Sequence, residues 1–199
     1  MKPFRAFLTL LFAMLPWLAL ALPFAAEARD AINTNGSSAG IAISGLDTVA
    51  FFTQGKAVQG VPSIAYEWKG ATWRFASRAD RRLFVAHPER YAPQWGGYCA
   101  VGISDGHVSR HTVAGSFDIQ NGKLYLFAKG NPGDFDQWRK VWYEKDGGPS
   151  SRVPTGEANW QQLKPRVEAG EDAPKLAGGV HQPLQRPAAP PTPAPAPAP

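Results

Sequence analysis

Two stretches of the chain alternate hydrophobic and polar residues on either side of a two-residue turn, which is the pattern of a β-hairpin. The first is SIAYEWKGATWRFA, residues 63–76, with Lys69-Gly70 at its centre. A turn there places the large apolar side chains on one face of the hairpin and the polar side chains on the other. The facing pairs that it predicts are Tyr66 with Trp73 and Ile64 with Phe75.

The second stretch is SFDIQNGKLYLFA, residues 116–128, which turns at Asn121-Gly122. This dipeptide favours a tight hairpin turn because Asn and Gly accept the positive φ that both central positions require. We expect the two hairpins to form one small antiparallel sheet. The facing pairs predicted in the second hairpin are Ile119 with Leu124 and Phe117 with Leu126.

A helical pattern follows the first hairpin. Ser77, with Asp80 three residues later, is an N-capping signature, and it begins a helix that carries Leu83 and Phe84. We expect this helix to end before Pro88, because a proline cannot continue the hydrogen-bond ladder.

A second helix is predicted after the second hairpin, with Asn131 as its cap, Pro132 at its first position and Asp134 near its positive end. A short last helix is expected around residues 158–160. Two hairpins covered by short helices predict a single domain of the α+β class over residues 44–163. The apolar stripe of the second helix, at spacings of three and four, is Phe135, Trp138, Val141 and Trp142.

The two ends of the sequence differ from this middle part. Residues 1–28 are predicted to be a cleavable signal peptide, with a basic start, an apolar run and an A-x-A site at Ala26–Ala28, so we expect a periplasmic or secreted protein. A second A-x-A at residues 19–21 leaves the cleavage position open. Residues 29–43 are expected to be a flexible segment, and residues 164–199, ending PAAPPTPAPAPAP, a Pro/Ala-rich disordered tail.

The charge of the chain limits the classes of partner that we expect it to bind. The formal net charge is +5, and the densest basic cluster is Arg78, Arg81 and Arg82. We interpret this cluster as the solvated face of a helix and expect no nucleic-acid partner, because such surfaces concentrate more Lys and Arg. After signal cleavage no remaining apolar segment is long enough to span a membrane. The partners considered are a metal ion and a protein component of the cell envelope.

Catalytic motifs are absent from the sequence: it contains no G-x-S-x-G, H-E-x-x-H, G-x-G-x-x-G or P-loop. No catalytic residue is therefore predicted. His107 and His111 form an H-x-x-x-H pair, which on a helix would share one face. The β-branched residues around them favour a strand, where the two Cα atoms would lie ~13 Å apart, too far for a common ion without bending.

Cys99 is the only cysteine of the chain, and it follows paired glycines in YAPQWGGYCA. Three interpretations stay open. A lone thiol in an oxidising compartment survives if it is a buried packing residue. It could instead bind a soft ion such as copper(I) or zinc, with His107 and His111 as helpers, or act as a redox or nucleophilic thiol.

Several blocks of the sequence together resemble exported YHS-domain proteins. They are GLDTVAFFTQGKAVQG, YEWKGATWRFAS, HPERYAPQWGGYCA and NGKLYLF, in this order, with ANW at residues 158–160. The resemblance runs from about Ser44 to Leu163 and implies a small metal-handling module, because relatives are attached to copper-transporting ATPases. Such forms often carry a first cysteine in a D-P-V-C motif, where this chain has Asp47-Thr48-Val49-Ala50, so only Cys99 matches the pair.

The sequence thus predicts a non-enzymatic binding or accessory module, with copper as the favoured ligand and Cys99, His107 and His111 as its metal residues. An alternative is a structural interaction domain of the cell envelope in which Cys99 is only packed. A thiol-dependent enzyme using Cys99 is the third interpretation.

Overall fold

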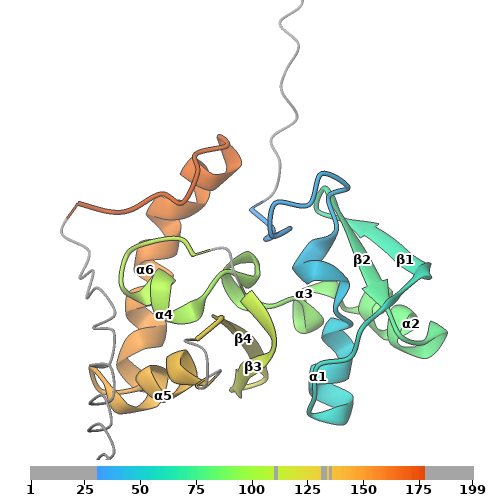
Figure 1. Ribbon diagram of the computed structural model, residues 1–199, viewed down its shortest axis with the longest axis horizontal. Coiled ribbons are helices and arrows are strands. Elements are labelled where there is room, and N and C mark those ends of the chain that lie inside the picture. The colour runs from blue at the N-terminus through green and yellow to red at the C-terminus, as the bar shows by residue number, and fades with distance from the viewer. Residues whose placement is uncertain (1–30, 110–111, 131–133, 135, 178–199) are drawn as a thin grey trace, which may run out of the picture.

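The computed structural model describes residues 31–109, 112–130, 134 and 136–177 (Figure 1). The predicted signal peptide lies outside the described residues. Helices and short strands alternate along the described chain, which confirms the α+β class. The elements are η1 (Ala42–Gly45), α1 (Thr48–Gln54), β1 (Val61–Trp68), β2 (Ala71–Phe75), α2 (Arg78–Ala86), α3 (Pro88–Tyr91), η2 (Gln94–Gly97), α4 (Ala100–Ser104), β3 (Thr112–Gln120), β4 (Lys123–Ala128), α5 (Gln137–Glu144) and α6 (Pro149–Glu168).

Both predicted hairpins are present, but in the described residues they form two separate two-stranded sheets rather than one sheet. Their turns have positive φ at both central residues, 48° and 65° at Lys69-Gly70 and 50° and 73° at Asn121-Gly122. The turns therefore bring predicted pairs of side chains opposite each other across the two strands. The confirmed pairs are Tyr66 with Trp73, Phe117 with Leu126 and Ile119 with Leu124.

The predicted pairing of Ile64 with Phe75 is wrong. Phe75 pairs with Val61, and the register shifts between Val61 and Ala65. Pro62 lies in this interval and has no N–H to donate, so the ladder is interrupted there. The extra residues bulge out of β1 towards α2.

Helix α2 begins and ends where the sequence predicts. The Ser77 hydroxyl accepts a hydrogen bond from the Asp80 N–H at 3.0 Å, and the helix ends at Ala86, two residues before Pro88. Phe84 is fully buried, whereas Leu83 is 39% exposed. Only Phe84 of the predicted pair therefore anchors the helix.

Helix α5 begins at Gln137 with Asp136 as its N-cap residue, later than predicted. Asp134 instead forms a turn, since its carbonyl accepts from the Gln137 N–H at 3.3 Å. The predicted cap Asn131, with Pro132 and Phe135, lies outside the described residues. The rest of the stripe is confirmed: Trp142 is fully buried, and Trp138 and Val141 pack against the same cluster.

Helix α6 is the main departure from the sequence prediction, because the expected short helix is 20 residues long. It continues past Leu163 to Glu168 and contains Pro154 and Pro165. The segment after it also packs: the Leu176 N–H donates to the Gly106 carbonyl at 2.8 Å, and the Val108 N–H donates to the Pro174 carbonyl at 2.9 Å. The predicted domain boundary at residue 163 is therefore too early, and residues 178–199 lie outside the described residues.

Both ends of residues 31–43 pack against the core, unlike the flexible segment predicted, and only the turn between them has exposed residues. Ala31 is 4% exposed and Ile43 is 1% exposed. The backbone N–H of Asn33 donates to the Gly96 carbonyl at 2.8 Å, and its side-chain amide donates to the Gly97 carbonyl at 3.1 Å. Buried backbone groups need such partners, and this segment finds them in the glycine pair before Cys99.

Strand β4 lies between two hydrophobic clusters, which Figure 1 shows as two lobes side by side. Leu124 and Leu126 join the cluster formed with α1, α2 and β2. Tyr125 and Phe127 join the cluster formed with α4, α5 and α6. One strand therefore contributes alternate residues to both clusters and joins them into one body. Among the described residues, no helix has the length and apolar character needed to cross a membrane.

Candidate functional site

The glycine pair before Cys99 receives the N-terminal segment of the chain. Gly96 has φ 64° and Gly97 has φ 79°, a region that side-chain-bearing residues avoid. A Cβ atom on Gly96 would collide with the Ala31 carbonyl, and one on Gly97 would collide with the Ile43 side chain. The close approach that these glycines permit is therefore to the protein's own chain.

Cys99 is a buried thiol, 2% exposed, within the cluster formed with α4, α5 and α6. Burial raises its pKa above the usual value, although neighbouring backbone groups of Gly102, Ala128 and Val101 oppose the shift. A raised pKa favours the neutral thiol over the thiolate, which is the form that binds metals and attacks electrophiles. Its surroundings therefore fit a packing residue.

His107 follows α4, and its ring lies against Gly102, where an added Cβ atom would be 3.2 Å from Nε2. Its backbone pairs with Lys175 in an isolated bridge. His111 lies outside the described residues. Within the described residues no three His, Cys, Asp or Glu side chains gather as a metal site. Of the three predicted metal residues the structure describes only Cys99 and His107, so the predicted copper or zinc site stays a prediction, and the neutral thiol disfavours it.

Trp95, the tryptophan in the glycine-rich loop, is only 5% exposed and packs edge-on to Tyr125. Its Nε1 donates to Glu157 of α6 at 3.1 Å. Its ring covers Gly156, where any Cβ atom would collide with it. Trp95 therefore packs α6 against the core. Its ring has no exposed face on which a sugar ring of a ligand could stack.

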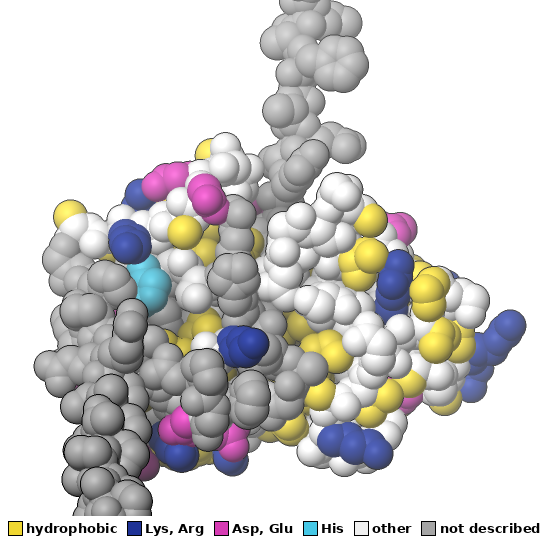
Figure 2. Space-filling model, viewed as in Figure 1, with side chains coloured by type: hydrophobic (Ala, Val, Ile, Leu, Met, Phe, Trp, Pro, Cys, Tyr) yellow, Lys and Arg dark blue, Asp and Glu magenta, His cyan; other side chains and the backbone are white. Residues whose placement is uncertain are grey.

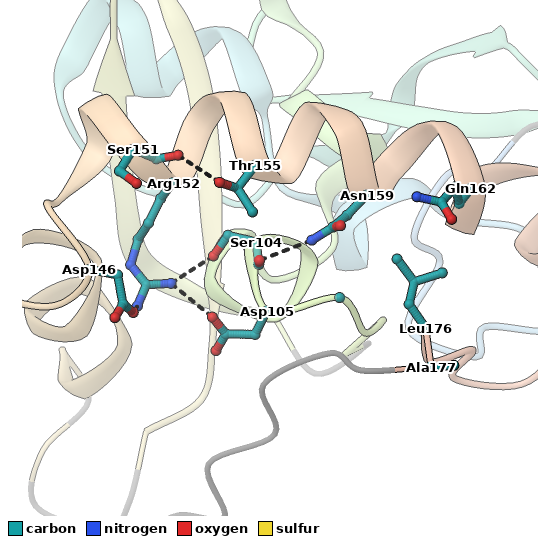
Figure 3. A pocket seen from close by; sticks show the side chains of 11 residues that line it. Ser104, Asp105, Asp146, Ser151, Arg152, Thr155, Asn159, Gln162, Leu176 and Ala177 are labelled. Carbon is teal, nitrogen blue, oxygen red and sulfur yellow. Dashed lines mark hydrogen bonds and ion pairs between the residues drawn. The ribbon is translucent and has the colours of Figure 1, made fainter.

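The strongest candidate site is a polar cavity of about 400 Å³ between α6, the end of α4 and the segment at residues 176–177 (Figure 3). One wall is a stripe of polar residues along α6, at spacings that bring them to one helical face. The opposite wall is the turn after α4, and Leu176 and Ala177 add an apolar edge. The stripe consists of Ser151, Arg152, Thr155, Asn159 and Gln162.

Arg152 organises this cavity from a buried position, with 3% of its surface exposed. One terminal nitrogen donates to the Ser104 hydroxyl at 2.7 Å and to the Asp105 carboxylate at 3.0 Å. The other terminal nitrogen donates to the Asp146 carboxylate at 2.6 Å. Its Nε has no hydrogen-bond partner among the described residues. The guanidinium is thus held rigidly but is not fully satisfied.

Asn159 and Gly106 fix the other wall of the cavity. The Asn159 amide donates to the Ile103 and Ser104 carbonyls, both at 3.0 Å. These carbonyls lie at the end of α4, and the Ile103 carbonyl also accepts from the Gly106 N–H at 3.0 Å. Gly106 has φ 82° and turns the chain so that its carbonyl accepts from Leu176. Helix α6 and the C-terminal segment therefore hold the Ser104-Asp105 pair in place.

The electrostatics of the cavity are those of an anionic polar site. Burial raises the pKa of Asp105, and the nearby Asp146 adds to the rise, while Arg152 and His107 lower it. The formal charges of Asp105, Asp146 and Arg152 sum to −1 when both carboxyls are ionised. Such a cavity can accept hydrogen bonds from hydroxyl or amine groups, and it disfavours an anion.

The sequence did not predict this site, because the site depends on the length of α6. Arg152 and Asn159 appear on one face only if a helix begins near Pro149 and continues through Pro154. The detectable signal was the spacing of Ser151, Thr155, Asn159 and Gln162, which is helical.

Comparisons of the chain with protein-family models, curated proteins and solved structures found no match.

Proposed function

We propose that this chain is an exported YHS-domain protein that acts as a non-enzymatic binding or accessory module of the cell envelope, with the Arg152 cavity as its binding site. The observation that carries the proposal is a guanidinium that is 3% exposed, held by three side chains and yet not fully satisfied, at the wall of an accessible cavity. Buried polar groups of this kind are usually fully paired, and exceptions concentrate at functional sites.

The ligand class follows from the groups that face the cavity. Hydroxyls of Ser104 and Ser151, the amide of Gln162 and the carboxylates of Asp105 and Asp146 offer mainly acceptors, and Leu176 offers an apolar edge. A small polyhydroxylated molecule donates to these acceptors and also has oxygens that can accept from the guanidinium, and an added amine offsets the negative charge. We therefore infer a small polar ligand that is neutral or cationic, such as an amino sugar.

Cys99 has a structural role in this proposal. Its thiol lies in the core cluster at the start of α4 and is protonated at neutral pH because burial raises its pKa. The envelope interaction domain with a packed thiol, one of the interpretations of the sequence, fits this geometry better than a metal carrier does.

The test is a ligand screen with two matched variants. Thr155→Phe places a ring in the cavity from an exposed position whose hydroxyl donates to the Ser151 carbonyl, whereas Gln161→Phe places the same ring elsewhere on α6. A panel of amino sugars, diamines and matched carboxylates is screened by ligand-observed NMR. We expect cationic and neutral members to bind the wild type and Gln161→Phe, and to lose at least tenfold in affinity for Thr155→Phe. Binding by the carboxylates, or equal binding to both variants, would contradict the proposal.

A further inference from the structure

A second cavity lies on the other lobe, between α2 and the bulged part of β1. It has a volume of about 380 Å³ and is lined by Ser63, Ile64 and Ala65 from the strand and by Arg78, Arg81 and Arg82 from the helix. No acidic residue lines it. We call it the arginine groove. Its positions at i, i+3 and i+4 place all three guanidinium groups on one face of α2.

The three arginines have no ion-pair partner among the described residues. Arg81 is nevertheless fixed: its Nε donates to the Ala65 carbonyl at 2.8 Å, and its guanidinium lies 5.6 Å from the centre of the Tyr66 ring. Arg78 and Arg82 are exposed on either side of it. The groove therefore combines one preorganised guanidinium with two adaptable ones.

This arrangement is unfavourable for the isolated helix. Like charges three and four residues apart repel each other, and cations near the N-terminus oppose the helix dipole. Asp80, the acidic residue of the first turn, does not offset the positive charge of the groove, because it is 8% exposed and its carboxylate accepts from the Ser77 hydroxyl. An oxyanion held between the arginines would remove the repulsion and interact well with the dipole.

Exposed apolar side chains flank the groove. Val85 of α2, about one turn after Arg81 and Arg82, is 39% exposed, and Val61 at the start of β1 is 40% exposed. Figure 2 shows dark blue basic and yellow hydrophobic side chains next to one another at the end of the molecule where Figure 1 places α2 and β1. Basic residues beside exposed apolar residues on one helix are typical of surfaces that lie on anionic membranes.

We infer that the arginine groove docks this protein onto an anionic phospholipid surface, with lipid phosphate groups between Arg78, Arg81 and Arg82 and with Val61 and Val85 entering the headgroup region. The occupant is a lipid rather than a soluble phosphate, because a soluble anion gives no reason for the apolar residues to flank the groove. The Arg152 cavity is on the other lobe, so this docking is independent of the proposed binding function.

The experiment measures co-sedimentation of the full mature chain with vesicles of phosphatidylcholine alone or mixed with phosphatidylglycerol. We expect binding only to the mixed vesicles, and weaker binding as ionic strength rises. The double variant Arg78→Glu/Arg82→Glu should bind at least tenfold more weakly, since each basic residue at such a surface contributes about fivefold. The control is Lys123→Glu/Arg139→Glu, which makes the same change of charge away from the groove.

Two further arms separate the sources of binding. Val61→Thr/Val85→Thr keeps every charge and the branched shape of each side chain and should still weaken vesicle binding, whereas its thermal unfolding should stay close to that of the wild type because about 40% of each side chain is exposed. Inorganic phosphate is titrated in parallel. Equal loss in the two charge variants would show general attraction by net charge and overturn the inference. Phosphate binding without vesicle binding, or binding to an acidic protein only, would overturn it too.

Discussion

Gly96 shows at the scale of one residue why the block before Cys99 has its composition. Its φ of 64° and the contact with the Ala31 carbonyl both exclude a side chain. The sequence could indicate that something approaches this backbone closely, but it could not identify residues 31–43 as the partner, because their pairing is long-range. In the structure, the glycine pair makes its close contacts with the N-terminal segment.

Substitution of Gly96 by Ala should therefore be far more costly than substitution of Gly122, which has φ 73° but open space around it. Gly122→Ala imposes only left-handed backbone strain, about 1–2 kcal/mol. Gly96→Ala adds a backbone collision, and we expect a total loss of at least about 4 kcal/mol. Urea denaturation of the two variants and the wild type measures the difference. Equal losses would mean that residues 31–43 do not pack as described.

Cys99 supports a second prediction at this scale. Because the thiol is buried and its pKa is raised, native protein should react with a thiol reagent much more slowly than unfolded protein. Cys99→Ala should cost about 1 kcal/mol, the cost of removing one small apolar group from a core.

The same variant tests the metal hypothesis. Copper(I) titration of the reduced wild type and of Cys99→Ala should give indistinguishable binding. Fast labelling of native protein, or copper binding that disappears with Cys99, would restore the metal interpretation of the sequence.

At the scale of the element, the hairpins and α2 could be predicted because their signals are local. Asn121-Gly122 and Lys69-Gly70 determine the turn, and Ser77 with Asp80 determines a helix start. The separation of the hairpins into two sheets, and the length of α6, depend on packing between distant residues. Pro154 and Pro165 locally disfavour a long helix. Tertiary contacts, such as that of Trp95 with Gly156, stabilise α6 in spite of this local preference.

The contact between α4 and α6 gives a prediction about pH. Burial raises the pKa of Asp105, so above about pH 4 the folded state retains a proton that the unfolded state has lost. Folding stability from this group is therefore lost as pH rises from the ordinary value through the raised one. Asp105→Asn removes the ionisable group. As pH rises from about 4 through the raised pKa of Asp105, the free energy of unfolding of the variant should therefore increase relative to that of the wild type.

Urea denaturation at a series of pH values measures the effect as the difference between variant and wild type. Asp47 is shifted in the same direction, and the difference cancels its contribution. The control is Asp146→Asn, which removes a carboxylate from the same guanidinium at a side chain that is 71% exposed. If the two variants alter the pH dependence equally, burial of Asp105 is not the cause.

At the scale of the whole molecule, both ends of the described chain are tied to the segment around Cys99. Asn33 binds the carbonyls of Gly96 and Gly97, and Pro174 and Leu176 pair with Val108 and Gly106. The sequence suggested a domain of residues 44–163 because its Pro-rich composition begins near Lys164. The amino-acid composition changes gradually after Lys164, whereas backbone hydrogen bonds to the domain continue as far as Leu176.

Truncation separates these two boundaries. A chain ending at Ala177 should be as stable as the full chain, because a Pro/Ala-rich segment has little apolar surface to bury. A chain ending at Leu163 loses the last turn of α6, the packing of Val167 and Leu176 on the core cluster, and two backbone hydrogen bonds to the turn after α4. We expect it to lose about 2–4 kcal/mol of stability. It should also lose ligand binding at the Arg152 cavity, because the apolar edge of that cavity is removed. Thermal and urea unfolding of the three lengths, followed by tryptophan fluorescence, measure the effect. Equal stability of all three would place the boundary at residue 163 after all.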